Sequence, residues 1–255
     1  MPCSVGTDDG RDRVAVPTTR AIGNGVRVPD DTREATATEA LVDPWDGDPR
    51  LEAFFGDAWP AVVTFHDFLV TDGELRGLVG PRERSRLWER HLLNSAAVVP
   101  FLPPSGLVVD LGSGAGLPGV VIAAMLPDAT VMLVEPMERR VAWLHDVVDR
   151  TGLTNVEVRR ARAQELDGAI EADAVTARAV AALDKLYRWT APLVRVGGSV
   201  VALKGARAQE ELDEAARVMR QVGLTNGQVH EAVTIEGIEP TRVVTAVRGG
   251  SGRVR

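Results

Sequence analysis

A run of glycines directly after a short apolar segment constrains the fold of this chain more than any other feature. Leu107–Asp110 is apolar and β-branched, as in a buried strand, and it continues into Asp110-Leu-Gly-Ser-Gly-Ala-Gly-Leu-Pro-Gly119. The apolar run Leu117–Leu126 then predicts a helix. Glycines between a strand and a helix let the backbone turn tightly and approach a ligand closely. Free N–H groups at the start of a helix suit a phosphate or a carboxylate.

Short β-branched runs alternate with helical ones after this motif. This alternation predicts an α/β fold, a doubly wound parallel sheet with helices on both faces. A further helix is predicted at Arg139–Thr151, and the further parallel strands are predicted at Thr130–Glu135, Asn155–Arg159, Ala174–Thr176 and Ser199–Leu203. Two alternating runs, Gln228–Ile235 and Arg242–Arg248, are joined by a short loop. They predict an antiparallel hairpin at the edge of the sheet.

The chain divides by composition into a tail, a helical extension and the α/β domain. Residues 1–45 are rich in Gly, Pro, Thr, Asp and Arg and poor in large apolar residues, so this tail is predicted to be disordered. Residues 46–100 carry apolar side chains at helical spacing over Leu51–Leu69 and again over Pro81–Val99. Residues 101–250 form the predicted α/β domain.

Charge and cysteine content exclude several classes of protein. A net charge of −7 argues against a protein coated in positive charge, although the second predicted helix carries a local group of arginines, Arg82, Arg84, Arg86 and Arg90. The single cysteine, Cys3, allows neither an internal disulfide nor a cysteine-based metal cluster, so no metal site is predicted. The chain shows no signal peptide and no apolar stretch of about 20 residues. A cytoplasmic protein without a membrane segment is therefore expected.

Two cofactors are compatible with the glycine motif. Gly114, Gly116 and Gly119 fit the dinucleotide pattern G-x-G-x-x-G, which would suit a nicotinamide-dependent oxidoreductase. The acidic Asp110 before the glycines, Pro118 after the third glycine and the terminal hairpin favour S-adenosylmethionine instead. Asp110 could order the loop and face the amino group of that cofactor. Glu135, at the end of the second predicted strand, could bind ribose hydroxyls in either case.

Ligands of an open parallel sheet bind beyond the carboxyl ends of its strands. The predicted binding residues are therefore Gly112–Leu117, which includes Gly114 and Gly116, with Glu135, the Ala163-Gln164-Glu165 turn, Thr176–Ala179 and Lys204-Gly205. Ala163 and Gln164 could contact the adenine edge or merely begin a helix. Arg178 could contact cofactor or target, or pair with a carboxylate at the end of the sheet.

Missing residues narrow the chemistry of a methyl transfer. Methylation of a pyrimidine C5 needs a cysteine nucleophile, and Cys3 lies far out in the tail. Thr176-Ala-Arg-Ala179 occupies the place of the Asn/Asp-Pro-Pro-aromatic motif of amino methylation. With Lys185 and Lys204 as its lysines, the chain also lacks a full Lys-Asp-Lys-Glu set for ribose methylation. Guanine N7 carries an exposed lone pair, needs no general base, and leaves catalysis mainly to positioning.

Four motifs occur in the order typical of one family: Trp88-Glu-Arg-His-Leu-Leu-Asn-Ser95, Val109–Gly119, Thr176–Ala179 and Ala202-Leu-Lys-Gly205. Together they resemble the GidB/RsmG family of bacterial small-subunit ribosomal RNA methyltransferases. The resemblance implies a class I S-adenosylmethionine-dependent methyltransferase, Rossmann-like, that acts on guanine N7 in 16S ribosomal RNA, alone or within the small ribosomal subunit. It also implies cofactor contacts at Gly112, Leu117, Ala163, Gln164 and Arg178. Arg76-Gly-Leu-Val-Gly80 departs from the Asn-Leu-Thr element of many members.

His91 and the arginines remain open to two interpretations each. His91 is either a catalytic residue, with Arg178, or a hydrogen-bonded histidine of the core. The arginine-rich helix, with Arg139 and Arg140, either contacts RNA phosphates or is a solvated charged face. A small-molecule methyltransferase on the same fold is the first alternative function, and a nicotinamide-dependent oxidoreductase is the second.

Overall fold

The computed structural model describes residues 42–80 and 83–250. The predicted tail of residues 1–45 therefore lies outside the described residues up to position 41, as does Pro81 at the predicted start of the second helix. Within the described part, Asp43 is buried and accepts hydrogen bonds from the backbone N–H groups of Trp45 (3.1 Å) and Trp88 (3.0 Å). Nowhere in these two stretches is a helix long and apolar enough to cross a membrane.

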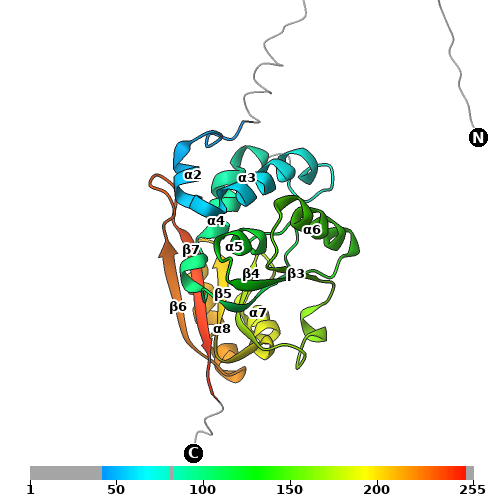
Figure 1. The fold of residues 1–255 in the computed structure, drawn as a ribbon. Coiled ribbons are helices and arrows are strands. Elements are labelled where there is room, and N and C mark those ends of the chain that lie inside the picture. The colour runs from blue at the N-terminus through cyan, green and yellow to red at the C-terminus, as the bar shows by residue number, and fades with distance from the viewer. Residues whose placement is uncertain (1–41, 81–82, 251–255) are drawn as a thin grey trace, which may run out of the picture.

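A seven-stranded sheet forms the centre of the molecule, with strand order β3-β2-β1-β4-β5-β7-β6 (Figure 1). The strands are β1 (Gly106–Leu111), β2 (Ala129–Val134), β3 (Val156–Arg159), β4 (Ala172–Arg178), β5 (Val194–Lys204), β6 (Leu224–Ala232) and β7 (Thr241–Arg248). β1 to β5 are parallel, whereas β7 runs antiparallel to both β5 and β6. The predicted doubly wound sheet and terminal hairpin are confirmed, with β6 at the edge.

Alternating side chains along each strand supply two separate cores. Val108 of β1 belongs to the apolar cluster on one face, and the next residue, Val109, belongs to the cluster on the other. Helices α5 (Gly119–Met125) and α6 (Glu138–Thr151) cover the first face, and α7 (Leu183–Thr190) and α8 (Ala208–Gln221) cover the second. Both faces of the sheet are therefore buried, as the apolar strands require.

The N-terminal extension is helical but more broken than predicted. Its first part comprises α2 (Pro49–Phe55), η1 (Gly56–Ala58), α3 (Trp59–Phe68) and η2 (Leu69–Gly73). A continuous helix over Leu51–Leu69 is wrong because Gly56 ends α2 and Pro60 occupies the first turn of α3, a position that only a new helix tolerates. A regular helix over Pro81–Val99 is also wrong: the described segments are η3 (Arg84–Arg86), η4 (Trp88–Leu93), α4 (Asn94–Ala96) and η5 (Val99–Phe101).

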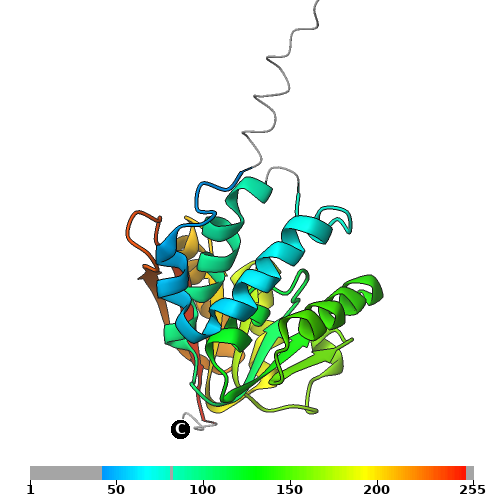
Figure 2. The same cartoon turned by 45° about the horizontal axis from the view of Figure 1, so that its top comes forward.

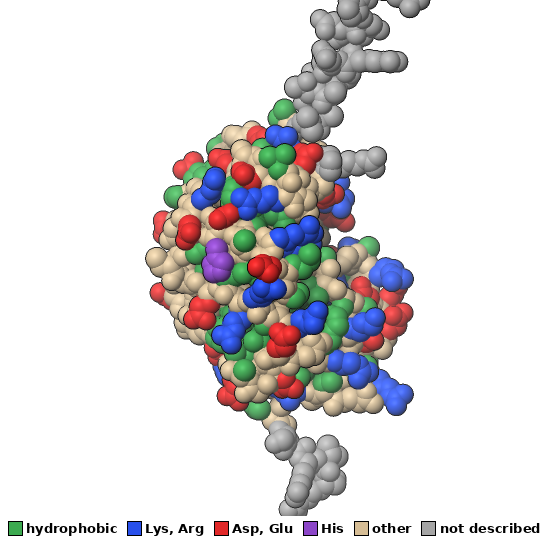
Figure 3. Space-filling view, turned by 90° about the vertical axis from the view of Figure 1, so that its right-hand side faces the viewer, with side chains coloured by type: hydrophobic (Ala, Val, Ile, Leu, Met, Phe, Trp, Pro, Cys, Tyr) green, Lys and Arg blue, Asp and Glu red, His purple; other side chains and the backbone are tan. Residues whose placement is uncertain are grey.

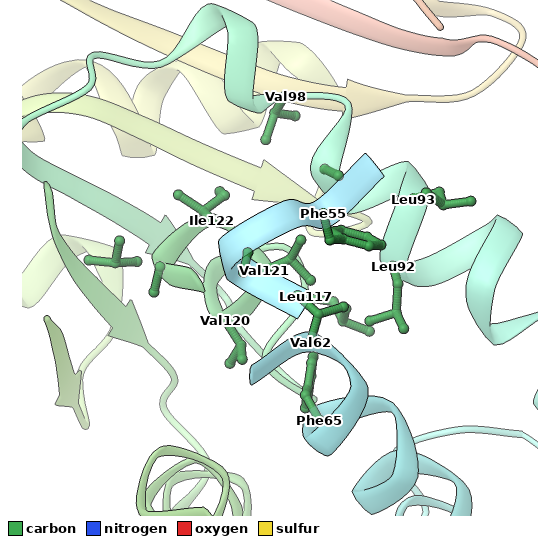
Figure 4. Close-up of a cluster of buried hydrophobic side chains, with 14 of the residues drawn as sticks. Phe55, Val62, Phe65, Leu92, Leu93, Val98, Leu117, Val120, Val121 and Ile122 are labelled. Carbon is green, nitrogen blue, oxygen red and sulfur yellow. The ribbon is translucent and has the colours of Figure 1, made fainter. Parts of the chain in front are cut away.

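The extension shares its hydrophobic core with the sheet domain. Phe55, Val62 and Phe65 pack into the same cluster as Val120 and Val121 of α5, as Figure 4 shows. Figure 2 shows the N-terminal helices lying along the α5 and α6 side of the sheet. Because these helices complete that core, they hold a fixed position beside the carboxyl ends of the strands.

Two predicted boundaries at the glycine motif are corrected. The predicted helix Leu117–Leu126 begins only at Gly119, because the glycine loop extends through Pro118. The predicted strand Thr130–Glu135 ends at Val134, although the backbone N–H of Glu135 still donates to the carbonyl oxygen of Arg159 at the end of β3 (3.1 Å). Both shifts place more backbone in the loop at the carboxyl ends of β1 and β2.

Candidate active site

Asp110 organises the glycine loop from inside the protein. Its side chain is fully buried, and its Oδ2 accepts a hydrogen bond from the backbone N–H of Gly119 (3.0 Å). A Cβ atom at position 119 would lie 2.6 Å from this oxygen, so glycine is required there for space. Burial raises the pKa of Asp110 to about 6, although the hydrogen bond from Gly119 opposes that shift. The prediction that Asp110 orders the loop is confirmed.

The second carboxylate oxygen of Asp110 distinguishes this group from a purely structural one. Oδ1 is buried and has no hydrogen-bond partner among the described residues. A buried acceptor of this kind usually has a partner, and leaving it unpaired costs about 1–3 kcal/mol. This unpaired acceptor lies at the end of β1, directly beneath the glycine loop that the other oxygen holds.

Glu135 fixes the same loop from the neighbouring strand. Glu135 is 2% exposed, and its two oxygens accept hydrogen bonds from the backbone N–H groups of Gly114 (3.0 Å) and Met137 (2.9 Å). Arg140 Nη1 lies 3.7 Å from Oε2. Glu135 thus shapes the loop with both oxygens, and its predicted contact with ribose hydroxyls stays a prediction.

A cavity of about 290 Å³ opens beyond the ends of β1 and β2. Its lining is mainly apolar and brings together residues far apart in sequence: Leu111, Gly112, Val134, Pro136, Ala161, Arg162, Ala163, Gln164, Val180 and Trp189. The structure thus places Gly112 beside Ala163 and Gln164, which were predicted separately. Small-ligand pockets are typically apolar with few polar groups, as here. We refer to this space as the glycine-loop cavity.

A larger and more polar cavity, of about 580 Å³, lies beyond the ends of β4 and β5. Its lining comprises Glu89, Arg90, Asn94, Arg178, Ala179, Leu203, Lys204, Gly205, Ala206, Glu211, Glu239, Pro240, Thr241 and Arg242. The Asn94 amide donates to Thr241 Oγ1 (2.9 Å), which joins the N-terminal extension to β7. We refer to this space as the β4–β5 cavity.

Lys204 forms a fixed cation in the wall of the β4–β5 cavity. Its Nζ donates to the carbonyl oxygen of Ala181 (2.7 Å) and to Glu211 Oε2 (2.8 Å), and its side chain is 10% exposed. Lys204 and Gly205 were predicted from their place at a strand end. Glu211 was not, since it lies in α8 and its sequence neighbours give no signal of a site.

Arg178 ends β4 at the point where the two cavities meet. Arg178 and Ala179 line the β4–β5 cavity, while the next residue, Val180, lines the glycine-loop cavity. Burial lowers the pKa of Arg178 to about 10, while the charge of Asp110 acts in the opposite direction. The guanidinium remains cationic at neutral pH, so a fixed positive charge stands between the two spaces.

His91 contacts Arg178 directly and faces neither cavity. Its Nδ1 lies 3.1 Å from Arg178 Nη2, and its Nε2 lies 2.9 Å from Glu83 Oε2. Burial and the adjacent Arg178 lower the pKa of His91 to about 4. The structure thus brings the two predicted catalytic residues together, and it adds Glu83, which sequence reasoning missed.

Other predicted residues lie outside both cavity linings. Gly116 packs against Val120 and Phe65, and Leu117 is 5% exposed within the core of the N-terminal helices. Cofactor contacts at Gly114, Gly116 and Leu117 stay predictions. Conversely, Trp189 and Val180 were missed as cavity residues, because an apolar side chain near an amphipathic helix predicts only a core position.

The arginines predicted to contact RNA differ in their surroundings. Arg86 pairs with Glu89 (3.2 Å), and Arg84 lies 3.9 Å from Glu74. Arg140 lies 3.7 Å from Glu135, Arg90 and Arg139 are exposed, and Arg82 lies outside the described residues. Basic and acidic side chains are interspersed on the face that Figure 3 shows. Across residues 42–80 and 83–250, no group of three or more His, Cys, Asp or Glu side chains is arranged to hold a metal ion.

Comparison with known proteins identifies the family. Residues 59–237 match the profile of GidB, described as rRNA small subunit methyltransferase G. A ribosomal RNA small subunit methyltransferase G from Beutenbergia cavernae is 51% identical over 209 residues, which are 82% of this chain and 97% of the relative. The chain belongs to the GidB family. Its relative from Leifsonia xyli subsp. xyli carries the same name and is 50% identical over 75% of this chain and 91% of the relative.

Solved structures agree with this GidB family assignment at the level of the fold. A SAM-dependent O-methyltransferase from Thermotoga maritima superposes with a TM-score of 0.51, at 15% identity, over 68% of this chain and 72% of that one. The predicted family, class I methyltransferase fold and enzyme class are confirmed, and with them S-adenosylmethionine as cofactor. These matches contradict the nicotinamide-dependent alternative.

Proposed function

We propose that this chain transfers a methyl group from S-adenosylmethionine to N7 of a guanine in 16S ribosomal RNA. The observation that carries the proposal is the pair of cavities that meet at residues 178–180. One is small, mainly apolar and bordered by the glycine loop, and the other is larger and polar. A methyl donor and an acceptor base need two such spaces side by side, because the transfer requires both groups in line.

The glycine-loop cavity fits the methyl donor. Ala163 and Gln164 offer a polar edge for adenine, while Val180 and Trp189 supply apolar surface for its ring faces. Asp110 lies outside the lining of this cavity and supports it from beneath, through its hydrogen bond from Gly119 of the loop. When bound, S-adenosylmethionine supplies an electrophilic methyl group on a sulfonium centre. Gly112 keeps the loop backbone close to that ligand without a side chain in the way.

The β4–β5 cavity fits the acceptor base. Its lining presents fixed donors, Asn94 and Lys204, together with carboxylates able to accept from a purine's N–H groups. No general base is needed for N7, and the one histidine beside the cavities, His91, has a pKa of about 4 with both ring nitrogens already in contact with side chains. These residues orient the target rather than exchange a proton with it.

The partner that this proposal requires is 16S ribosomal RNA, free or within the small ribosomal subunit, in the cytoplasm. The relatives of this chain are named for a ribosomal RNA target. Exposed arginines near the cavities, such as Arg90 and Arg139, would position the RNA through its phosphates.

The test is methyl transfer from labelled S-adenosylmethionine to small ribosomal subunits that lack this modification, followed by mass spectrometry of the nucleosides. We expect 7-methylguanosine with the wild type, none with Gly112→Val, and wild-type yield with the control Arg220→Ala, an exposed arginine at the end of α8 and outside both cavity linings. A different methylated nucleoside would refute the N7 assignment. Binding of S-adenosylhomocysteine without label in RNA would instead favour a small-molecule acceptor.

A further inference from the structure

Arg178 is held from the N-terminal extension by two consecutive residues. Its Nη1 donates to the backbone carbonyl oxygen of Arg90 (3.2 Å), and its Nη2 lies 3.1 Å from Nδ1 of His91. Both contacts come from η4, a segment distant in sequence from β4. The opposite nitrogen of the same imidazole, Nε2, lies 2.9 Å from Glu83 Oε2. A chain of polar contacts therefore runs from Glu83 through His91 to Arg178.

The chemistry of these groups fixes the proton on His91. A guanidinium can only donate hydrogen bonds, so Nδ1 must present its lone pair to Arg178. The hydrogen of the neutral ring is then on Nε2, where it is donated to the Glu83 carboxylate. A second proton on Nδ1 would face the guanidinium directly. Burial and the adjacent Arg178 oppose it, which is why the pKa of His91 falls to about 4.

We propose that Glu83 and His91 are positioning residues that hold the Arg178 guanidinium at the junction of the two cavities. Glu83 accepts the Nε2 hydrogen and so holds the ring in place, and the ring then fixes Nη2 of Arg178. This inference rests on the proposed function, because the junction matters only if both cavities are used. It also replaces the interpretation of His91 as a catalytic residue, since neither ring nitrogen is free.

The need for such a restraint follows from the side chain itself. An arginine side chain is long and has many rotamers, and Arg178 lines the β4–β5 cavity. Without contacts from η4, its guanidinium would sample positions inside the space proposed for the base. With them, the charge stays at the wall and the cavity stays open. Misplacement of a positioned group by about 1 Å can lower a rate about 100-fold.

Two matched variants separate positioning from structural support. The side-chain oxygen of His91→Asn can take the place of Nδ1 and accept from Arg178, whereas His91→Gln extends to the place of Nε2 and leaves Arg178 without that acceptor. We expect His91→Asn to keep kcat within about 3-fold of the wild type and His91→Gln to lower it by about 10- to 100-fold. KM for the small subunits should stay within about 3-fold in both, because neither variant removes a phosphate contact.

The same assay also gives the results that would overturn the positioning role. Equal kcat for His91→Asn and His91→Gln, or losses that follow their urea unfolding midpoints, would overturn the positioning role. Absence of 7-methylguanosine with the wild-type chain would refute the proposed function instead, so the two failures are distinguishable.

The tautomer of His91 can be measured directly in the wild-type protein, without an activity assay. Nitrogen-15 NMR of the histidine rings reports which nitrogen carries the hydrogen, and the chain has 4 histidines to resolve. We expect His91 to be in the Nε2–H form at pH 7, with and without S-adenosylhomocysteine. We expect Glu83→Ala to free the ring to turn away from Arg178, which gives a mixture of tautomers and a lower kcat. An Nδ1–H ring or an imidazolium in the wild type would overturn the inference.

Discussion

Replacement of Gly112 by alanine tests both the loop conformation and the close packing of the glycine-loop cavity. Gly112 has φ +76°, a backbone conformation that costs an alanine about 1–2 kcal/mol. A Cβ atom there would also lie 2.9 Å from Cγ2 of Val180, and such overpacking costs about 1–3 kcal/mol. We therefore expect Gly112→Ala to lower the free energy of unfolding by about 2–5 kcal/mol.

Gly152 provides the matched control. It ends α6 with φ +68°, and no atom lies within 4 Å of the position of its Cβ. Gly152→Ala should therefore cost only the backbone part, about 1–2 kcal/mol. In a Val180→Ala background the crowding partner is removed, so Gly112→Ala should there cost no more than the control substitution.

Urea unfolding of Gly112→Ala, Gly152→Ala, Val180→Ala and the double variant measures these differences in stability. Thermal shift with S-adenosylhomocysteine measures ligand binding at the cavity. Because Gly112 and Val180 line the same cavity, the ligand-induced rise in melting temperature should shrink in Gly112→Ala and persist in Gly152→Ala. The packing argument is refuted if Gly112→Ala costs no more than Gly152→Ala, or if the Val180→Ala background leaves its cost unchanged.

Three further substitutions test the loop and its surroundings. Because the pKa of Asp110 rises from 3.8 to about 6 on folding, the wild type should lose up to about 3 kcal/mol of stability between pH 4 and pH 8. Asp110→Asn should not show this loss, and an equal pH dependence of urea unfolding in the two proteins would contradict the argument. Trp143→Phe removes the donor to the Ala115 carbonyl oxygen (2.9 Å) and should lower the free energy of unfolding by about 1–3 kcal/mol. It should also weaken S-adenosylhomocysteine binding in calorimetry, and unchanged affinity would show that this contact from α6 does not support the glycine loop. Lys204→Met leaves Glu211 unpaired and should lower the free energy of unfolding by about 1–3 kcal/mol, and a second substitution, Glu211→Leu, should largely restore it. If the double variant is no more stable than Lys204→Met, the loss does not come from the unpaired Glu211.

The sheet could be predicted from the sequence because its strands follow a local pattern of β-branched residues. The carboxyl-end rule then placed Gly112 and the Ala163-Gln164 turn at one edge, and the structure joins them in one cavity. Strand bounds were less accurate where glycines interrupt the apolar run, as at Gly197 and Gly198 within β5. Local patterns weaken there, while pairing with a neighbouring strand continues the element.

The polar contacts of the site could not be predicted in the same way. Arg178 and His91 are 87 positions apart, and only the shared core of the extension and the sheet brings them together. Glu135 was predicted from its place after a strand, but its rotation toward Gly114 depends on loop geometry that no spacing encodes. The irregular turns of η4 depend likewise on tertiary packing, which overrides local helix propensity.

The position of β7 has a consequence for biosynthesis. The last strand of the described chain pairs with β5 on one side and β6 on the other, so neither has its full set of partners until residues 241–248 have been synthesised. A nascent chain that ends before Thr241 exposes the apolar edge of β5, an unpaired edge of the kind that promotes aggregation. Completion of the sheet is therefore a late event, and small C-terminal truncations are expected to be far more damaging than their length suggests.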